Sequence, residues 1–326
     1  MRFTVLGGGR WGVALAKHLL SLGNGVMVFD RNPEVLRLLS QGVHPYIEGI
    51  SFPPPMTTDV LKEAIGFSDY LVLALPVQVI GQVLKGSPLK GKKVISASKG
   101  LEIGTYRRVS QVIKDLEDEV ETFCLSGPSF ASEVSKGLPT ALVLAGERLE
   151  ELKVIRDAIS SENFRVYLST DLVGVELGGA IKNVIAIACG ISDGLCFGEN
   201  ARAALMTRGL AEMVRIGLSL GARRETFYGL SGMGDLFLTA SSTQSRNRTF
   251  GYLLGRGLSV KEAIKEIGQT VEGLYTAKAL YQLSEEKGLH APISKAVYRV
   301  VVEGQSSLET ALELLRVPPQ RDFEFE

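Results

Sequence analysis

The chain has 326 residues, and because domains usually contain roughly 100–200 residues, this length predicts two of them. Thirty-six Lys and Arg residues balance thirty-six Asp and Glu residues, which excludes a general surface for nucleic acid or anionic membranes. Hydrophobic residues make up 45% and charged residues 22%, a globular mixture that excludes a disordered chain. No uninterrupted apolar run reaches the ~18 residues of a membrane span, and the first apolar run is too short for a signal peptide.

The cysteine pattern bears on compartment and on metal binding. Cys124, Cys189 and Cys196 are odd in number and lack C-x-x-C spacing. A disulfide framework and a thiolate zinc site are therefore not expected, and we predict a cytoplasmic protein without a metal site.

The first half of the chain alternates short apolar runs with amphipathic segments of helix length. The predicted strands are 3–6, 26–29, 70–75, 94–98 and 123–125, and the predicted helices are 11–22, 33–41, 77–84 and 107–117. Such alternation predicts a doubly wound α/β domain with a parallel sheet covered on both faces. The prolines at 53–55 mark a loop.

After about residue 169 the pattern changes to helical blocks separated by Gly, Ser and Asn. The predicted helices are 172–190, 200–220, 224–228, 247–255, 260–266, 273–287, 293–303 and 307–316. We therefore predict an α/β domain over 1–168 and an all-helical domain over 169–326.

A glycine motif follows the first predicted strand. Gly7, Gly9 and Gly12 form G-x-G-x-x-G between a strand and a helix, and Asp30 ends the second strand. This context favours a Rossmann dinucleotide site, in which the glycines allow a tight turn, approach of a pyrophosphate and close helix packing. The alternative is a glycine-rich structural turn.

A dehydrogenase needs a group that exchanges a proton near neutral pH, usually histidine. The three histidines are better explained as packed or surface residues, since His18 lies within the first helix and His44 in a loop. Lys182 is the only charged residue between positions 177 and 192, and burial there would lower its pKa toward a useful range. The alternative is a lysine that reaches solvent at the helix surface.

Polar residues also follow two strands of the predicted sheet. Lys99 comes directly after strand 94–98, and the turn 126–129 follows strand 123–125. Open α/β sheets bind ligands at the carboxyl ends of their strands. These residues are candidates for substrate contact, with ordinary strand-end residues as the alternative.

The helical half contains a candidate anion site. Asp235 is flanked by glycine, and the stretch 245–248 places two arginines where a helix begins, which suits a phosphate dianion. The alternative for the arginines is a solvated loop. Glu272 could cap a helix or contact a ribose hydroxyl.

These motifs occur together, in order, along nearly the whole chain. They include GGGRWGVALA, SASKGLE, LSGPSFASEV, GVELGGAIKNVIAIACGISDG, GLSGMGDLFLT and QSRNRTFG. The chain resembles the bacterial-type, cytosolic, NAD(P)-dependent glycerol-3-phosphate dehydrogenases, which reversibly reduce dihydroxyacetone phosphate for phospholipid synthesis.

The resemblance implies roles for individual residues. Lys182 would donate the proton in reduction and accept it in oxidation, with Lys99 and Asp235 binding the reacting oxygen and positioning Lys182. The implied substrate-binding residues are Lys99, Gly127, Ser129, Lys182, Asp235, Ser245, Arg246 and Asn247. The implied cofactor-binding residues are Gly7, Gly9, Arg10, Trp11, Gly12, Asp30, Arg31, Lys99, Ala131, Arg246 and Glu272. Arg10 departs from the family, which usually has Ser or Asn there.

The expected cofactor is NAD(H) or NADP(H), with NADH slightly favoured. Asp30 replaces the small residue common in the family, and a carboxylate there accepts hydrogen bonds from a ribose 2′-OH and repels a 2′-phosphate, whereas Arg31 acts in the opposite sense. The resemblance also suggests a homodimer. The alternatives are a two-domain β-hydroxyacid or sugar-acid dehydrogenase, and a non-catalytic dinucleotide-binding redox sensor.

Overall fold

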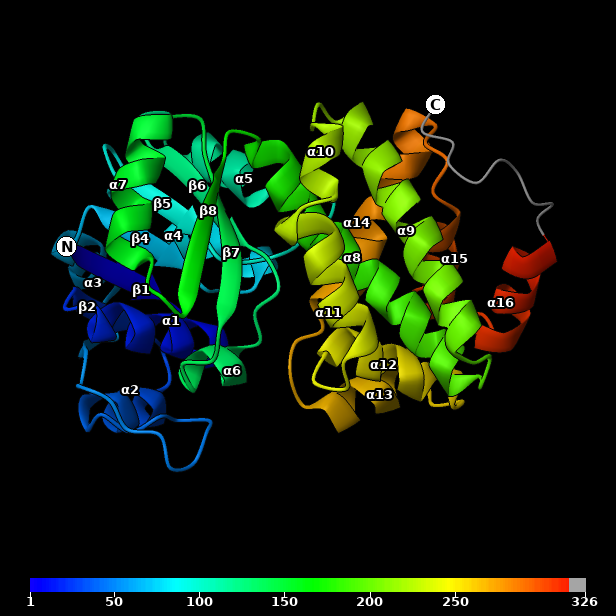
Figure 1. The fold of residues 1–326 in the computed structure, drawn as a ribbon, viewed down its shortest axis with the longest axis horizontal. Helices are drawn as coiled ribbons and strands as arrows, with labels where there is room; N and C mark the ends of the chain where they lie inside the picture. The colour runs from blue at the N-terminus through cyan, green and yellow to red at the C-terminus, as the bar shows by residue number, and fades with distance from the viewer. Residues whose placement is uncertain (317–326) are drawn as a thin grey trace. The chain divides into compact units, whose positions relative to one another are not determined.

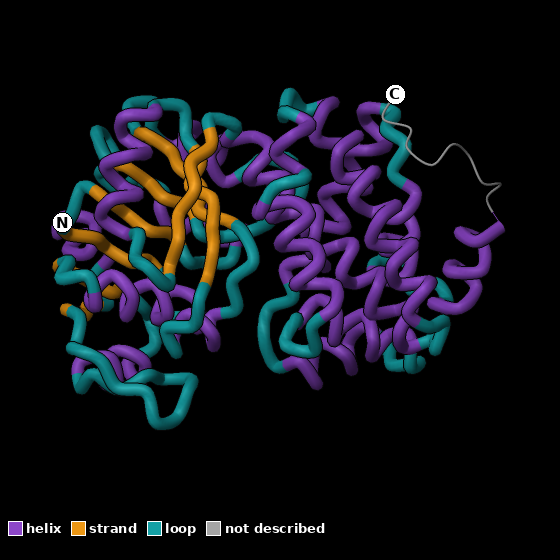
Figure 2. The backbone as a smooth tube through the Cα atoms, in the orientation of Figure 1, coloured by secondary structure: helices purple, strands orange, loops and turns teal. Residues whose placement is uncertain are grey.

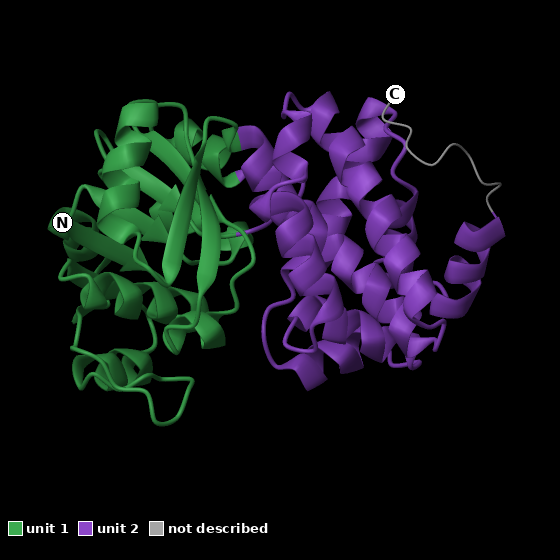
Figure 3. Ribbon diagram, viewed as in Figure 1, with its two compact units in different colours: residues 1–98, 109–172 green, residues 99–108, 173–326 purple. Residues whose placement is uncertain are grey.

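A computed structural model describes residues 1–316, which form two compact units (Figure 3). Unit 1 contains residues 1–98 and 109–172, and unit 2 contains residues 99–108 and, of the described chain, residues 173–316. The sequence-based division at 168/169 treats each domain as one continuous segment, and its residues 317–326 lie outside the described part. Residues 99–108 belong to unit 2 because Leu101 is buried in its core and Arg108 pairs with Glu176 at 2.6 Å.

The strands and helices of unit 1 alternate along the chain (Figure 1). They are β1 (Arg2–Leu6), α1 (Arg10–Ser21), β2 (Gly25–Phe29), α2 (Pro33–Ser40), β3 (Met56–Thr58), α3 (Leu61–Phe67), β4 (Tyr70–Leu73), α4 (Val77–Leu84), β5 (Lys93–Ser96), α5 (Val109–Leu116), β6 (Glu121–Ser126), α6 (Ala131–Ser135), β7 (Thr140–Ala145), α7 (Leu149–Ile159) and β8 (Phe164–Ser169). The strands form one sheet in the order β3-β2-β1-β4-β5-β6-β7-β8.

The first six strands have the order of a Rossmann sheet, which confirms the predicted fold class. The five predicted strands, which correspond to β1, β2, β4, β5 and β6, pair in parallel as expected, whereas β7, which was not predicted, pairs antiparallel with β6. Helix α6 has only five residues, about 8 Å of helix, which is too short to carry the chain back along a six-residue strand of about 20 Å. The chain therefore reverses, and β7 and β8 run opposite to the other strands.

Two hydrophobic layers cover the sheet. One includes Val13 and Leu19 of α1 with Leu152 of α7, and the other includes Ile80 of α4 with Val112 of α5. Helices on both faces leave the strand ends as the accessible edge for ligands.

Unit 2 contains helices and loops (Figure 2). Its elements are α8 (Leu172–Gly194), α9 (Glu199–Ser219), α10 (Arg224–Phe227), the π-helical turn η1 (Leu230–Gly234), α11 (Asp235–Ser241), α12 (Arg246–Gly255), α13 (Val260–Ile267), α14 (Glu272–Lys287), α15 (Pro292–Val301) and α16 (Ser307–Arg316). The prediction of a helical second half is confirmed, although it omitted η1 and α11.

Helix α8 lies at the centre of unit 2. Leu177, Ile181 and Ile185 are fully buried there. By length and composition α8 could cross a membrane, but 89% of its most apolar window is buried within the protein. Its apolar character is therefore that of a core helix, which also explains the unusual setting of Lys182.

Helix α12 packs against α8 through glycines. A Cβ atom on Gly190 of α8 would lie 2.0 Å from the Arg248 carbonyl oxygen, and one on Gly251 of α12 would lie 2.1 Å from the Ile187 carbonyl oxygen. Only glycine permits this backbone approach. The contact fixes the start of α12, where Arg246 lies, relative to the helix that carries Lys182.

Candidate active site

Lys182 and Asp235 form the centre of a buried polar cluster in unit 2. The Lys182 Nζ donates to Asp235 Oδ1 at 2.7 Å and to Thr239 Oγ1 at 2.7 Å. Lys99 Nζ donates to the other carboxylate oxygen, Oδ2, also at 2.7 Å. The side chains of Lys182 and Asp235 are 8% and 2% exposed. The structure thus brings together the three residues for which the sequence suggested catalysis.

Burial and neighbouring charges shift the pKa values of Lys182 and Asp235. Burial lowers the pKa of Lys182 from 10.5 to about 8, assisted by the positive charges of Lys99 and Arg246 and opposed by Asp235. Burial raises the pKa of Asp235, but Lys182 and Lys99 outweigh this effect, so its pKa lies below the usual value. Asp235 is therefore a stable carboxylate, and Lys182 can gain or lose a proton near neutral pH.

Thr239 is a member of the cluster that the sequence analysis missed. It lies one helical turn after Asp235 in α11, and its hydroxyl donates to Asp235 Oδ1 at 3.2 Å. The i, i+4 spacing of Asp235 and Thr239 was the available signal, but α11 itself was not predicted. Two of the three N–H donors of Lys182 are used by Asp235 and Thr239, which leaves one for a substrate oxygen.

Lys99 reaches the cluster because residues 99–108 leave the sheet after β5 and join unit 2. Its side chain is 17% exposed, more than that of Lys182. Lys99 thus pairs with Asp235 and remains partly exposed.

The N-terminus of α12 contains Ser245, Arg246 and Asn247. The Ser245 hydroxyl caps the helix by accepting from the Arg248 backbone N–H at 3.2 Å. Arg248 pairs with Asp193 at 2.6 Å, so its guanidinium has a structural partner. Arg246 is exposed and close enough to influence the pKa of Lys182. Arg246 is the first residue of α12 and a candidate for binding an anion.

Asn247 links three helices rather than extending into solvent. Its Nδ2 donates to Asn183 Oδ1 at 2.9 Å on α8, and its Oδ1 accepts from the Gly273 N–H at 3.0 Å on α14. Glu272 is the first residue of α14, directly before Gly273. Asn247 thus fixes the start of α14 and, with it, Glu272.

The glycine motif of unit 1 forms a tight loop between β1 and α1. Gly7 has φ +112°, a conformation that favours glycine, and an added Cβ would lie 2.7 Å from the Ala74 carbonyl oxygen. The Cβ position of Gly9 instead faces open space, with nothing within 4 Å. The loop therefore has room beside Gly9 for a pyrophosphate at the N-terminus of α1.

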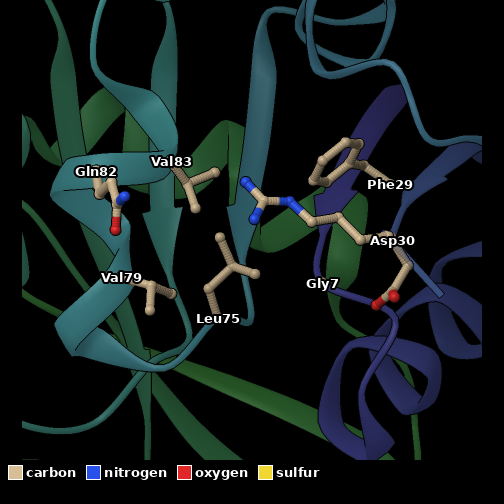
Figure 4. Close-up of a pocket in the computed structure, with 8 residues that line it drawn as sticks. Gly7, Phe29, Asp30, Leu75, Val79, Gln82 and Val83 are labelled. Carbon is tan, nitrogen blue, oxygen red and sulfur yellow. The ribbon is translucent and has the colours of Figure 1, made fainter.

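Asp30 and Arg31 line a cavity of about 230 Å³ next to this loop. Val79, Gln82 and Val83 of α4 form one wall, Phe29 and Asp30 lie opposite, and Leu75 lies between them (Figure 4). The Asp30 carboxylate accepts from Gly8 N at 2.7 Å and from Asn32 N at 2.8 Å. These residues fit the adenosine end of a dinucleotide.

The remaining predicted cofactor and substrate residues of unit 1 lie at two helix starts. The Arg10 guanidinium lies 5.6 Å from the Tyr46 ring centre, and the buried Trp11 indole N–H has no acceptor within residues 1–316. Ser129 donates its hydroxyl hydrogen bond to the Gly127 carbonyl at 3.0 Å. Ala131 is the first residue of α6.

Both halves of the chain are similar to known proteins. Two family models, described as the N-terminus and the C-terminus of NAD-dependent glycerol-3-phosphate dehydrogenase, match residues 2–152 and 171–313. A glycerol-3-phosphate dehydrogenase [NAD(P)+] from Thermoanaerobacter sp. (strain X514) is 44% identical over 97% of each chain, and one from Thermotoga sp. (strain RQ2) is 44% identical over 99% of each chain.

A solved structure agrees with these relatives. The crystal structure of glycerol-3-phosphate dehydrogenase from Coxiella burnetii superposes with a TM-score of 0.92 at 36% identity, covering 97% of this chain and 98% of the other. The matches cover both units and leave no large segment unassigned. The chain belongs to the NAD-dependent glycerol-3-phosphate dehydrogenase family.

Proposed function

We propose that this protein reversibly reduces dihydroxyacetone phosphate to sn-glycerol 3-phosphate with NADH or NADPH. The observation that carries the proposal is the buried Lys182–Asp235 pair, in which the pKa of Lys182 is about 8. A lysine with this pKa can supply a proton to a ketone oxygen and recover it from an alcohol.

The residues of the cluster have different roles at the reacting oxygen of the substrate. The remaining N–H of Lys182 donates to that oxygen, and its proton moves there during reduction. Asp235 and Thr239 hold Nζ in one orientation, and Lys99 supports the negative charge that develops on the oxygen. During oxidation the proton returns to neutral Lys182.

Arg246 and the N-terminus of α12 support phosphate recognition. A guanidinium at the first helical position acts together with the positive end of the helix dipole. Ser245 and Asn247 hold this helix start in place through their own hydrogen bonds. Gly127 and Ser129 are proposed as further substrate contacts from unit 1.

The dinucleotide-binding residues lie in unit 1, for which we propose the role of cofactor domain. Open space beside Gly9, the tight turn at Gly7 and the cavity lined by Asp30 and Arg31 all fit a nicotinamide dinucleotide. When bound, that group supplies or accepts the hydride. Gly12, Arg10, Trp11, Ala131 and Glu272 are proposed to contribute to the same site.

We favour NADH over NADPH. The Asp30 carboxylate is fixed by two backbone amides, so it cannot turn away from a 2′-phosphate, whereas Arg31 is exposed. Repulsion from a fixed carboxylate should outweigh attraction to an arginine that can extend into solvent.

The test is NADH oxidation with dihydroxyacetone phosphate and with unphosphorylated dihydroxyacetone. Turnover of the phosphorylated ketone alone is expected. Equal rates would contradict the phosphate site and favour a related two-domain dehydrogenase. Binding of NADH without turnover of either ketone would favour a redox sensor.

We further propose that the protein is cytoplasmic, forms a homodimer and serves glycerophospholipid synthesis. All three cysteines are free thiols, which supports a reducing cytoplasm. The exposed leucines Leu308, Leu312 and Leu315 of α16 support a homodimer, which sedimentation analysis can test. The product is the phosphorylated backbone of glycerophospholipids, so we assign the enzyme to their synthesis.

A further inference from the structure

The peptide between Gly8 and Gly9 is held by a residue outside the glycine motif. Tyr46, in the loop between α2 and β3, donates its hydroxyl to the Gly8 carbonyl oxygen at 2.9 Å. The Gly8 N–H is bound separately, to Asp30 Oδ2 at 2.7 Å. Gly8 is thus fixed from both sides by side chains distant in sequence.

This contact determines the direction of one N–H group. The Gly8 carbonyl and the Gly9 N–H belong to the same planar peptide and point in opposite directions. Within residues 1–316 the Gly9 N–H has no acceptor, and the space beside Gly9 is open. By holding the carbonyl on one side, Tyr46 directs the Gly9 N–H toward the other, where an anion can bind.

Tyr46 is itself held in place. Its backbone N–H donates to His44 Nδ1 at 3.1 Å, and His44 Nε2 lies 3.1 Å from the Ser135 hydroxyl of α6. Because Nδ1 accepts, Nε2 carries the proton of the neutral ring and donates to Ser135. His44 is 4% exposed, and the Arg10 guanidinium lies over the Tyr46 ring. Burial and the Asp30 charge raise the pKa of Tyr46, which keeps its hydroxyl a donor.

We propose that Tyr46 is a positioning residue for dinucleotide binding, which orients the Gly9 N–H toward the cofactor pyrophosphate, and that His44 positions Tyr46. The proposal rests on the cofactor role proposed for unit 1. It predicts that Tyr46 affects affinity for the phosphate-bearing part of the cofactor, with little effect on the chemical step.

The test is Tyr46→Phe, which removes only the hydroxyl and keeps the ring next to Arg10. Loss of one neutral hydrogen bond should raise the dissociation constants of NADH and of ADP-ribose about three- to tenfold. Affinity for adenosine, which lacks the pyrophosphate, the kcat and the KM for dihydroxyacetone phosphate should stay within about twofold. Calorimetric titration measures the binding constants without turnover.

Tyr70→Phe is the matched control. The Tyr70 hydroxyl donates to Glu151 at 2.8 Å. Tyr70 is the first residue of β4, so it lies at the end of the strands opposite the glycine loop. This variant should lose a hydrogen bond while binding NADH as wild type does. Equal weakening in both variants, or an unchanged dissociation constant in Tyr46→Phe, would overturn the proposal while leaving the dehydrogenase assignment intact. Failure of the wild-type protein to bind NADH would overturn both.

Two His44 variants separate its two contacts. His44→Asn places an amide oxygen near the position of Nδ1 and retains the acceptor for Tyr46, whereas His44→Gln retains a donor toward Ser135 and loses that acceptor. NADH should bind more weakly to His44→Gln than to His44→Asn. The opposite order would contradict the role of His44.

Discussion

At the residue scale, Lys182 lies on a buried apolar helix, and its ammonium group donates to two polar partners. Asp235 and Thr239 take two of its donors, and burial brings its pKa to about 8. Lys182→Ala should therefore lose on the order of 10²–10⁴ in kcat, the usual contribution of general acid–base catalysis. NADH affinity should change little, because the glycine loop belongs to the other unit.

Lys182→Met serves as a second variant, since it removes the charge and keeps most of the side-chain volume. Asp235 retains its pair with Lys99 at 2.7 Å in both variants, so both should fold. Steady-state kinetics and NADH titration measure the effects. A near-normal kcat in both would assign proton transfer to Lys99 instead.

The pKa of Lys182 also predicts opposite pH dependences for the two directions. Reduction needs protonated Lys182, so its kcat should fall as the pH rises through about 8. Oxidation needs the neutral amine, so its kcat should rise through the same range. Rate profiles in both directions check this, and two profiles that change in the same direction would contradict it.

Arg246 and Arg248 are two positions apart and have different predicted roles. Arg246→Ala should raise the KM for dihydroxyacetone phosphate roughly ten- to a hundredfold, because a charge-assisted hydrogen bond contributes about 1.5–3 kcal/mol. Arg246→Lys should recover only part of this loss, since the planar fork is absent.

Arg248→Ala is the matched control for Arg246. Arg248 pairs with Asp193, so its loss should lower stability toward urea more than it changes KM. A large KM effect in Arg248→Ala with none in Arg246→Ala would assign the phosphate to Arg248.

Asp30 lines the proposed cofactor cavity and also accepts a hydrogen bond from the Gly8 N–H. Asp30→Gly removes the repulsion of a 2′-phosphate and also releases the Gly8 N–H. Affinity for both cofactors should fall, while the ratio of kcat/KM for NADPH to that for NADH should rise. A wild-type preference for NADPH, or an unchanged ratio in the variant, would show that Arg31 dominates.

At the element scale, the crossing of α8 and α12 couples packing to substrate binding. Gly190→Ala would place a Cβ 2.0 Å from the Arg248 carbonyl oxygen, so α12 would have to move, at a cost of about 1–3 kcal/mol. Stability in urea should fall and the KM for dihydroxyacetone phosphate should rise, because Arg246 begins the displaced helix.

Gly66→Ala in α3 is the control for this substitution. Its Cβ position is open, so the added methyl should leave stability unchanged or raise it slightly. If Gly190→Ala had wild-type stability and a wild-type KM for dihydroxyacetone phosphate, the close packing of α8 and α12 would not determine substrate binding, which would contradict the prediction.

Some elements were predictable because their signals are local. Helices α1, α2 and α4 and strands β1 and β2 follow directly from hydrophobic periodicity with Gly and Pro at the boundaries. Strand β3 and helix α11 have only three and seven residues, too few to establish a period, and were not predicted. Strands β7 and β8 and helix α7 were not predicted either. The direction of β7 depends on the length of α6, which local pattern does not reveal.

At the scale of the whole molecule, the sequence by itself determined the class of fold, the glycine loop and the unusual character of Lys182. Each of these depends on residues that are close in the sequence. The signals are the strand–helix alternation, the spacing of three glycines and the single charge in an apolar helix. The order of motifs along the chain was likewise sufficient to indicate the family, which the comparisons then showed.

Only the tertiary structure decided which groups meet. Lys99 joins Asp235 across 136 positions, Arg248 pairs with Asp193, and Tyr46 reaches the Gly8 carbonyl across 38 positions. Residues 99–108 leave the sheet to pack with helices, and β7 reverses direction. Such pairings depend on burial and backbone geometry that form only when distant segments pack together, so no local pattern in the sequence specifies them.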